Sequence, residues 1–165
     1  MAVRPVLSLP DRRLSVPAGA VGTANVDELV RDLVDTMRAS PACVGLAAPQ
    51  IGVGLRAFVA DVSGHPRTTT SHGLVVLMDP EIIESHGREA GREGCMSVPH
   101  LTANVVRAQR IVVRGRQPDG SARVIATDGF EARAFQHEID HLDGSLILDR
   151  VASLSTDVFR RRRYQ

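Results

Sequence analysis

The run at residues 136–141, which reads Gln-His-Glu-Ile-Asp-His, constrains the fold of this chain more than any other segment. His137 and His141 are four residues apart, so on a helix they project from one face, about one turn above each other. Two neutral imidazoles in this arrangement can bind one transition-metal ion, and Glu138 between them can reach a water molecule at that ion. A surface helix that carries two histidines by chance has the same pattern, so the motif needs support from the rest of the chain.

The segment from Gly129 to Leu142 is predicted to form a helix that ends at Asp143-Gly144. The side chains of its predicted inner face follow one another in steps of three and four. These side chains are Phe130, Ala134, His137 and His141. A metal site buried against a sheet requires this combination of apolar residues and ligands.

The rest of the chain predicts short strands and two further helices. Apolar spacing predicts a helix over 26–37, with Asn25 and Glu28 as a capping box at its start, and a third helix from near Ser155. Strands are predicted at 55–62, 74–78, 81–85, 105–113 and 122–127, a hairpin turn at 118–120, and an exposed loop at 65–73. Mixed elements without regular βαβ alternation indicate an α+β fold, with antiparallel strands packed on helices.

Length and composition are those of an ordinary globular protein. We expect one domain over residues 1–165, with a basic tail from about residue 156 to residue 165. A net charge of +1 gives no reason to expect DNA or a membrane as a partner. No apolar run approaches the roughly eighteen residues that span a bilayer, and the N-terminal segment lacks the apolar stretch of a secretory signal. The expected location is therefore the cytoplasm.

A catalytic site of this type needs a third protein ligand and one open position. Downstream of His141, the carboxylates that could supply this third ligand are Asp143, Asp149 and Asp157. Upstream, Cys95 follows Gly94, and a glycine beside a cysteine in a turn lets the thiolate approach a metal closely. The alternative interpretation of Cys95 is a small buried apolar residue. A disulfide with Cys43 is disfavoured in a reducing compartment, so each cysteine needs its own explanation.

Three separated motifs resemble those of the peptide deformylase family, which removes the N-formyl group from new bacterial proteins. The motifs are Gly45-Leu46-Ala47-Ala48-Pro49-Gln50-Ile51-Gly52, Glu93-Gly94-Cys95-Met96-Ser97 and Gln136-His137-Glu138-Ile139-Asp140-His141. The resemblance extends from the first residues to about Arg150 and implies antiparallel strands around the helix that carries the two histidines. It implies that Cys95, His137 and His141 hold ferrous iron. Zinc, nickel or cobalt could replace the iron, because thiolate and imidazole ligands suit several of these ions.

The resemblance also implies roles for residues beside the ligands. Glu138 would accept the proton of the attacking water and pass it to the departing amine. The side-chain amide of Gln50 and the backbone N–H of Met96 would stabilise the charge that develops on the formyl oxygen. The residues expected to bind the N-formylmethionyl peptide are Val44, Gly45, Phe130, Arg133 and Ala134. Their side chains would form an apolar pocket for methionine, and backbone groups near Gly45 would pair with the extended peptide.

Other positions have structural expectations or depart from the family pattern. Glu93 and Arg107 are expected to form a structural ion pair, and Asp140 to orient an imidazole or cap backbone groups. Cys43 stands where the first motif opens with glycine, and it would strain the loop if that position requires an unusual φ. Met96 replaces the commoner leucine with little expected effect. Residues 100–104 lack an arginine that would steady the peptide, so substrate preference stays open.

Arg160–Arg163 concentrate positive charge near the end of the chain. They are expected either to form a solvated end or to contact ribosomal RNA where nascent chains emerge.

Other functions also stay open: hydrolysis of another formylated amide, or peptide or metal binding by a catalytically retired paralogue. Intact Cys95, Gln50 and Glu138 argue against the paralogue. A structural zinc module is an even less favoured interpretation, because such sites are closed by four ligands and three are apparent in the sequence.

Overall fold

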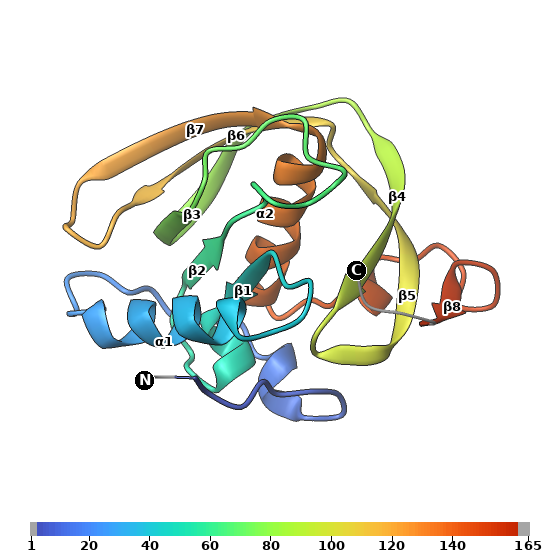
Figure 1. Ribbon diagram of the computed structural model, residues 1–165, viewed down its shortest axis with the longest axis horizontal. Coiled ribbons are helices and arrows are strands. Elements are labelled where there is room, and N and C mark those ends of the chain that lie inside the picture. The colour runs from blue at the N-terminus through green and yellow to red at the C-terminus, as the bar shows by residue number, and fades with distance from the viewer. Residues whose placement is uncertain (1–2, 162–165) are drawn as a thin grey trace.

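The computed structural model describes residues 3–161, which form a mixed α+β structure (Figure 1). Its helices are α1 (Asp27–Arg38) and α2 (Gly129–Leu142), with 3₁₀ helices at Arg12–Ser15, Ala48–Ile51 and Ile147–Asp149. Its strands are β1 (Gly45–Ala47), β2 (Ala57–Ala60), β3 (Val75–His86), β4 (Glu89–Cys95), β5 (Val98–Arg107), β6 (Arg110–Arg116), β7 (Ala122–Asp128) and β8 (Val158–Arg160). The predicted fold class is confirmed.

The strands described here form two antiparallel sheets, one of five strands in the order β1-β2-β3-β6-β7 and one of three in the order β4-β5-β8. Helix α2 lies between them (Figure 1). The polypeptide leaves the larger sheet along β3, forms β4 and β5 in the smaller sheet, and returns as β6. This route brings the end of β4, at Cys95, close to helix α2.

Helix α2 buries more of its surface than its amphipathic pattern predicts. Ala132, Phe135, Ile139 and Leu142 pack in the core with residues of β2, β3, β6 and β7. The rings of Phe135 and Phe58 of β2 have centroids 5.7 Å apart. The predicted inner face is therefore only one of two buried faces. The second face anchors the helix to the larger sheet, which fixes the direction in which the histidines project.

Two predictions near the ends of the chain are wrong. No helix follows Ser155 in the described residues; instead Val158–Arg160 form β8, which pairs with β5 at Leu101 and Ala103. The capping box predicted for Asn25 and Glu28 does not form, since Val26 takes the N-cap position of α1 without a side-chain bond. Asn25 accepts a hydrogen bond from the N–H of Asp27 at 3.0 Å, two residues along the chain.

Strand boundaries differ from the predicted ones for local reasons. The expected strands at 74–78 and 81–85 are one strand, β3, whose register shifts between Met78 and Glu81. The expected strand at 105–113 divides at Ala108 and Gln109 into the end of β5 and the start of β6. The hairpin around residues 118–120 is confirmed between β6 and β7. Within residues 3–161, neither α-helix is both long and apolar enough to cross a membrane.

Candidate metal centre

Cys95, His137 and His141 converge from two elements that are distant in the sequence. Cys95 ends β4, and the histidines lie one turn apart on α2. Their potential ligand atoms all lie within 4.8 Å of one another, and the Cys95 Sγ is 3.3 Å from the His141 Nε2. Cys95 and His141 are buried, and His137 is nearly so. A thiolate and two imidazoles at this spacing form a possible site for one divalent metal ion.

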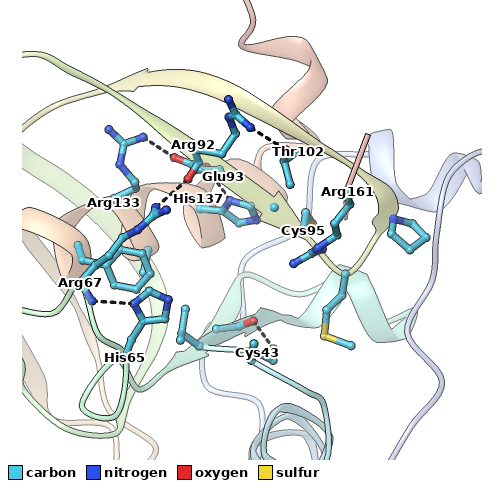
Figure 2. A pocket seen from close by; sticks show the side chains of 18 of the residues that line it. Cys43, His65, Arg67, Arg92, Glu93, Cys95, Thr102, Arg133, His137 and Arg161 are labelled. Carbon is cyan, nitrogen blue, oxygen red and sulfur yellow. Dashed lines mark hydrogen bonds and ion pairs between the residues drawn. The ribbon is translucent and has the colours of Figure 1, made fainter. Parts of the chain in front are cut away.

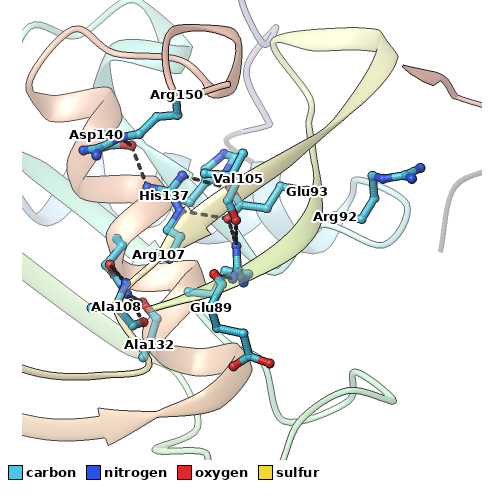
Figure 3. Close-up of polar contacts among 12 residues, drawn as sticks. Glu89, Arg92, Glu93, Val105, Arg107, Ala108, Ala132, His137, Asp140 and Arg150 are labelled. Atoms are coloured by element: carbon cyan, nitrogen blue, oxygen red, sulfur yellow. Dashed lines mark hydrogen bonds and ion pairs between the residues drawn. The ribbon is translucent and has the colours of Figure 1, made fainter. Parts of the chain in front are cut away.

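A network of charged side chains fixes the orientation of His137 (Figure 3). The His137 Nδ1 lies 2.9 Å from the Glu93 Oε1, which leaves Nε2 available to a metal ion. Arg107 donates to both carboxylate oxygens of Glu93, at 2.8 and 2.9 Å, so the expected ion pair is confirmed. Arg133 donates to the same carboxylate at 2.7 Å. Partners of this kind set the tautomer of a metal-binding histidine and raise its affinity for the ion.

Asp140 has a different role from the expected one. Its Oδ2 accepts hydrogen bonds from Arg107 at 2.7 Å and from Arg150 at 2.8 Å, and its Oδ1 accepts one from Arg150 at 2.6 Å. Asp140 therefore holds Arg107 rather than an imidazole. Because Arg107 is buried and charged, its two carboxylate partners are needed to offset the cost of burial.

The electrostatic environment favours a metal-binding form of the centre. Burial opposes ionisation of Cys95, but neighbouring His141 and His137 outweigh it and lower the pKa of the thiol well below its ordinary value. Burial also opposes ionisation of Glu93, yet hydrogen bonds from Arg107 and His137 lower the pKa of that carboxyl. The thiolate is the form of cysteine that binds metals, so this donor set fits a divalent ion.

Glu138, also on α2, lines a cavity beside the three candidate ligands. It is buried, and its Oε1 has no hydrogen-bond partner among residues 3–161. Burial raises the pKa of its carboxyl above the ordinary value, with the nearby Cys95 acting in the same direction. A Cβ atom on Gly45 would lie 2.6 Å from the Glu138 Oε2, so the glycine of β1 provides the space for this carboxylate.

Gln50 lies on the 3₁₀ helix Ala48–Ile51 with its side-chain amide held at both ends. Its Oε1 accepts a hydrogen bond from the N–H of Ala47 at 3.0 Å, and its Nε2 donates to Ser97 Oγ at 3.1 Å. The same Nε2 lies 3.8 Å from the Cys95 Sγ. The sequence pattern placed Gln50 near the ligands, but Ser97 as its anchor was not predicted.

A cavity of about 1010 Å³ opens beside these residues (Figure 2). Its lining includes Met96 and all the predicted peptide-binding residues, which are Val44, Gly45, Phe130, Arg133 and Ala134. It also includes His65, whose ring stacks on that of Phe130 with centroids 4.1 Å apart. Sequence reasoning missed His65 because it belongs to a polar segment predicted to be an exposed loop. The sequence signal there is an imidazole in a polar segment, and His72 gives the same signal.

Cys43 fits the loop without the strain that its replacement of glycine could have caused. Among the described residues around it, the left-handed conformation falls on Ala42, at φ 55°. The Cys43 thiol donates to the carbonyl of Gly45 at a Sγ–O distance of 3.1 Å, and burial raises its pKa to about 12. Both cysteines are free thiols, so no disulfide joins them, as expected.

The basic segment at 160–163 lies partly outside the described residues, which end at Arg161. Arg160 is exposed at the end of β8, and Arg161 lines the cavity. The N–H of Arg161 donates to the carbonyl of His100 at 2.9 Å, so the described part of this segment is ordered against β5.

Comparison with known proteins agrees with this geometry. The family model for polypeptide deformylase matches residues 3–157. The peptide deformylase of Thermodesulfovibrio yellowstonii is 38% identical over 98% of this chain and 97% of its own length. The crystal structure of a peptide deformylase from Legionella pneumophila superposes with a TM-score of 0.84 at 41% identity, covering 93% of this chain and 88% of that one.

A second solved structure contains a bound peptide. It is the Met-Ala-Ser complex of a peptide deformylase from Acinetobacter baumannii, with a TM-score of 0.82 at 31% identity over 92% of this chain and 100% of the other. Sequence, fold and the placement of the two histidines, the cysteine and the glutamate therefore lead to one conclusion. This chain belongs to the polypeptide deformylase family, whose members remove the N-formyl group from the N-terminal methionine of newly made proteins.

Proposed function

We propose that Cys95, His137 and His141 hold one divalent metal ion and that the chain hydrolyses the formyl amide of N-formylmethionyl peptides. Ferrous iron is the expected native ion, with zinc, nickel or cobalt able to replace it. When bound, such an ion supplies Lewis acidity, which activates water near neutral pH and polarises a carbonyl oxygen. The observation that carries the proposal is the convergence of these three ligand atoms within 4.8 Å of one another.

Glu138 is the proposed general base and acid. Its Oε1 has no partner among the described residues, and its raised pKa brings it closer to the operating pH of a proton carrier. It accepts a proton from the attacking water and then delivers that proton to the leaving nitrogen. The peptide amine departs, and formate is the second product.

Gln50 and Met96 are the proposed donors to the formyl oxygen. The Gln50 amide is already held by Ala47 and Ser97, so it needs little reorganisation when charge develops on that oxygen. Met96 lines the cavity next to Cys95, and its backbone N–H is the second proposed donor.

The peptide is proposed to bind along the free edge of β1. Val44 accepts a hydrogen bond from Asp61 on the β2 side, so the alternation of a strand directs the backbone groups of Gly45 towards the opposite side. An extended chain can pair with this edge, as in strand addition. The methionine side chain is then placed among Val44, Phe130, Ala134 and the stem of Arg133. The Acinetobacter relative binds Met-Ala-Ser, which supports a peptide as the ligand of this site.

A second candidate function is hydrolysis of another formylated amide. The observation that favours it is the Cys43 thiol, which occupies the Gly45 carbonyl that a peptide N–H would use. The first candidate predicts that a peptide displaces this weak donor, and the second predicts that it does not.

The proposal places the protein in the cytoplasm, where formylated chains are made, as one catalytic domain. Contact with ribosomal RNA through Arg160–Arg163 belongs to the same proposal, with the positive charge of that segment as its support.

The test is formate release by protein purified without oxygen and with its iron retained, because ferrous iron and a thiolate are both oxidisable. Formyl-methionyl peptides are compared with shorter formyl amides, and Glu138→Gln is the inactive control. Rapid release from the peptides supports the first candidate. Release from the other amides alone supports the second, and no release with metal bound contradicts both.

A further inference from the structure

The mouth of the cavity carries an excess of positive charge. The arginines that line it are Arg67, Arg92, Arg133, Arg160 and Arg161. Within the described residues, the carboxylates of the lining are Glu93 and Glu138, and both are buried. Glu93 is already bound by Arg107 and Arg133. Arg67 and Arg92 therefore present guanidinium groups that these two carboxylates do not neutralise.

Arg92 is the best-positioned of these side chains. Its Nε donates to the Asn104 Oδ1 at 3.1 Å, and its guanidinium carbon lies 3.5 Å from the ring centroid of Phe159. Its Nη1 is 3.5 Å from the Thr102 Oγ1, so Arg92 of β4 reaches the segment that lacks an arginine of its own. All these partners are uncharged. Over residues 3–161, no carboxylate lies within ion-pair distance of Arg92.

Arg67 approaches from the loop between β2 and β3. Its Nη1 donates to the backbone carbonyl of Arg92 at 3.2 Å, and its backbone N–H bonds to the His65 Nδ1 at 3.1 Å. Arg161 approaches from the other side, where its guanidinium lies so close to Gly94 that a Cβ there would be 2.9 Å from Nη2. Figure 2 shows Arg67 and Arg161 on opposite sides of the cavity, with Arg92 at its edge.

We propose that Arg92 and Arg67, with Arg161 opposite them, select peptides that carry an acidic side chain within the first few residues after the formylmethionine. This inference rests on the proposed function and adds a specificity to it. The carboxylate is the matching ligand because a planar guanidinium can donate to it twice. Arg92 is held by neutral partners, so binding an anion there breaks no existing ion pair.

The experiment measures kcat/KM for formyl-Met-Ala-Ala-Ala amides in which Asp, Gln or Lys replaces each alanine in turn. The amidated end removes the terminal carboxylate as a competing anion. At the best position, we expect the Asp peptide to exceed the Gln peptide by about tenfold and the Lys peptide to fall below it. The Asp advantage should decrease as salt rises from about 50 to about 500 mM, because partly exposed charges are screened.

Arg92→Gln and Arg67→Gln should each reduce the Asp-to-Gln ratio at least about threefold, and Arg92→Lys should retain part of it. Arg31→Gln, on the exposed face of α1 and outside the cavity, is the matched control and should leave the ratio unchanged. Thermal unfolding of each variant separates a local effect from loss of the fold. If Arg92→Gln does not fold, Arg67→Gln carries the test, since within residues 3–161 the Arg67 side chain makes one hydrogen bond, to the backbone carbonyl of Arg92.

Equal rates for the Asp and Gln peptides, or an Asp preference that survives both substitutions, would overturn the inference. Calorimetric binding of the unformylated peptides Met-Asp-Ala and Met-Gln-Ala, also as amides, tests the inference independently of the proposed function. If no peptide releases formate, the proposed function fails. Tighter binding of the Asp peptide still supports the selectivity in that case, and equal binding overturns it.

Discussion

At the residue scale, Glu93 connects the candidate metal ligands to the rest of the protein. One carboxylate contacts His137, Arg107 and Arg133, and Arg107 is held in turn by Asp140. The motif that contains Glu93 and Cys95 indicated a site from sequence. The ion pair with Arg107 was expected, but the contact with His137 was not, because it joins residues 44 positions apart that only the fold brings together.

Glu93→Gln should destabilise the protein and weaken metal binding together. The neutral amide removes the negative charge that pairs with the buried guanidinium groups of Arg107 and Arg133. We therefore expect the free energy of unfolding to fall by about 3 kcal/mol. Loss of the charge behind His137 should weaken metal affinity by about tenfold to a hundredfold. Denaturant unfolding and competition with a chelator measure the two effects. Glu89→Gln, an exposed carboxylate on the same strand, is the control and should change neither.

Gln50→Ala should lower turnover without releasing the metal. Removing a preorganised donor to the developing oxyanion typically costs about 3 kcal/mol, so kcat should fall by about a hundredfold or more. Metal content per chain, measured on the same samples, should stay at the wild-type value. A variant with wild-type kcat would remove Gln50 from the mechanism.

At the element scale, the sequence predicts elements whose own residues determine their structure. Helix α2 was predicted with its observed bounds, because Asp143-Gly144 ends it and its apolar spacing is regular. Strands β4 and β8 were missed because they contain few apolar residues in alternation. Their structure depends on pairing with β5 and on close approaches such as that of Arg133 to Gly91, where a Cβ would lie 2.8 Å from the guanidinium carbon.

Strand β1 leaves room for the carboxylate of Glu138, the proposed general base, because Gly45 has no side chain. In Gly45→Ala the new Cβ would lie 2.6 Å from the Glu138 Oε2, so the carboxylate must move. We expect kcat to fall by at least about tenfold, since a displacement of about 1 Å can cost that much or more. Gly54→Ala is the matched control because a Cβ there meets nothing within 4 Å. Equal kcat values in the two variants would contradict this role.

Strand β3 is fixed to the N-terminal segment by Asp79, whose φ of 47° lies in the left-handed region. Its carboxylate accepts hydrogen bonds from the N–H groups of Val21 and Gly22 and pairs with Arg116. Burial opposes ionisation, but these three donors outweigh it and lower the pKa of Asp79. The carboxyl therefore stabilises the fold above its unfolded pKa of about 4, and this stabilisation is lost as the pH falls through the lower folded value.

Asp79→Asn tests this dependence, because asparagine also tolerates the left-handed conformation. At pH 7 the free energy of unfolding should fall by about 1–2 kcal/mol relative to wild type. The difference should shrink as the pH is lowered below about 4, where wild type loses the charge as well. Denaturant titrations at several pH values measure it, with the exposed Glu84→Gln of β3 as control. A difference that is constant with pH would assign the effect to something other than the charge.

At the scale of the whole molecule, the candidate centre forms only when the two sheets and α2 are assembled. Cys95 comes from the smaller sheet, the histidines from α2, and Gln50 from the 3₁₀ helix that follows β1 of the larger sheet. The fold class was predicted, and so was the convergence of the three candidate ligands, because each of them lies in a local sequence motif. The charge of the cavity mouth was not predicted, since its arginines come from a loop, β4, α2 and the β8 segment, which are separated in sequence.

X-ray absorption at the metal edge of the iron-loaded or zinc-loaded protein tests whether Cys95, His137 and His141 hold one ion. We expect one bound ion per chain, with one sulfur ligand at about 2.3 Å and two imidazole nitrogens at about 2.0–2.1 Å for zinc. In Cys95→Ser the sulfur signal should vanish. A wild-type spectrum without sulfur, or with sulfur that persists in Cys95→Ser, would contradict this expectation.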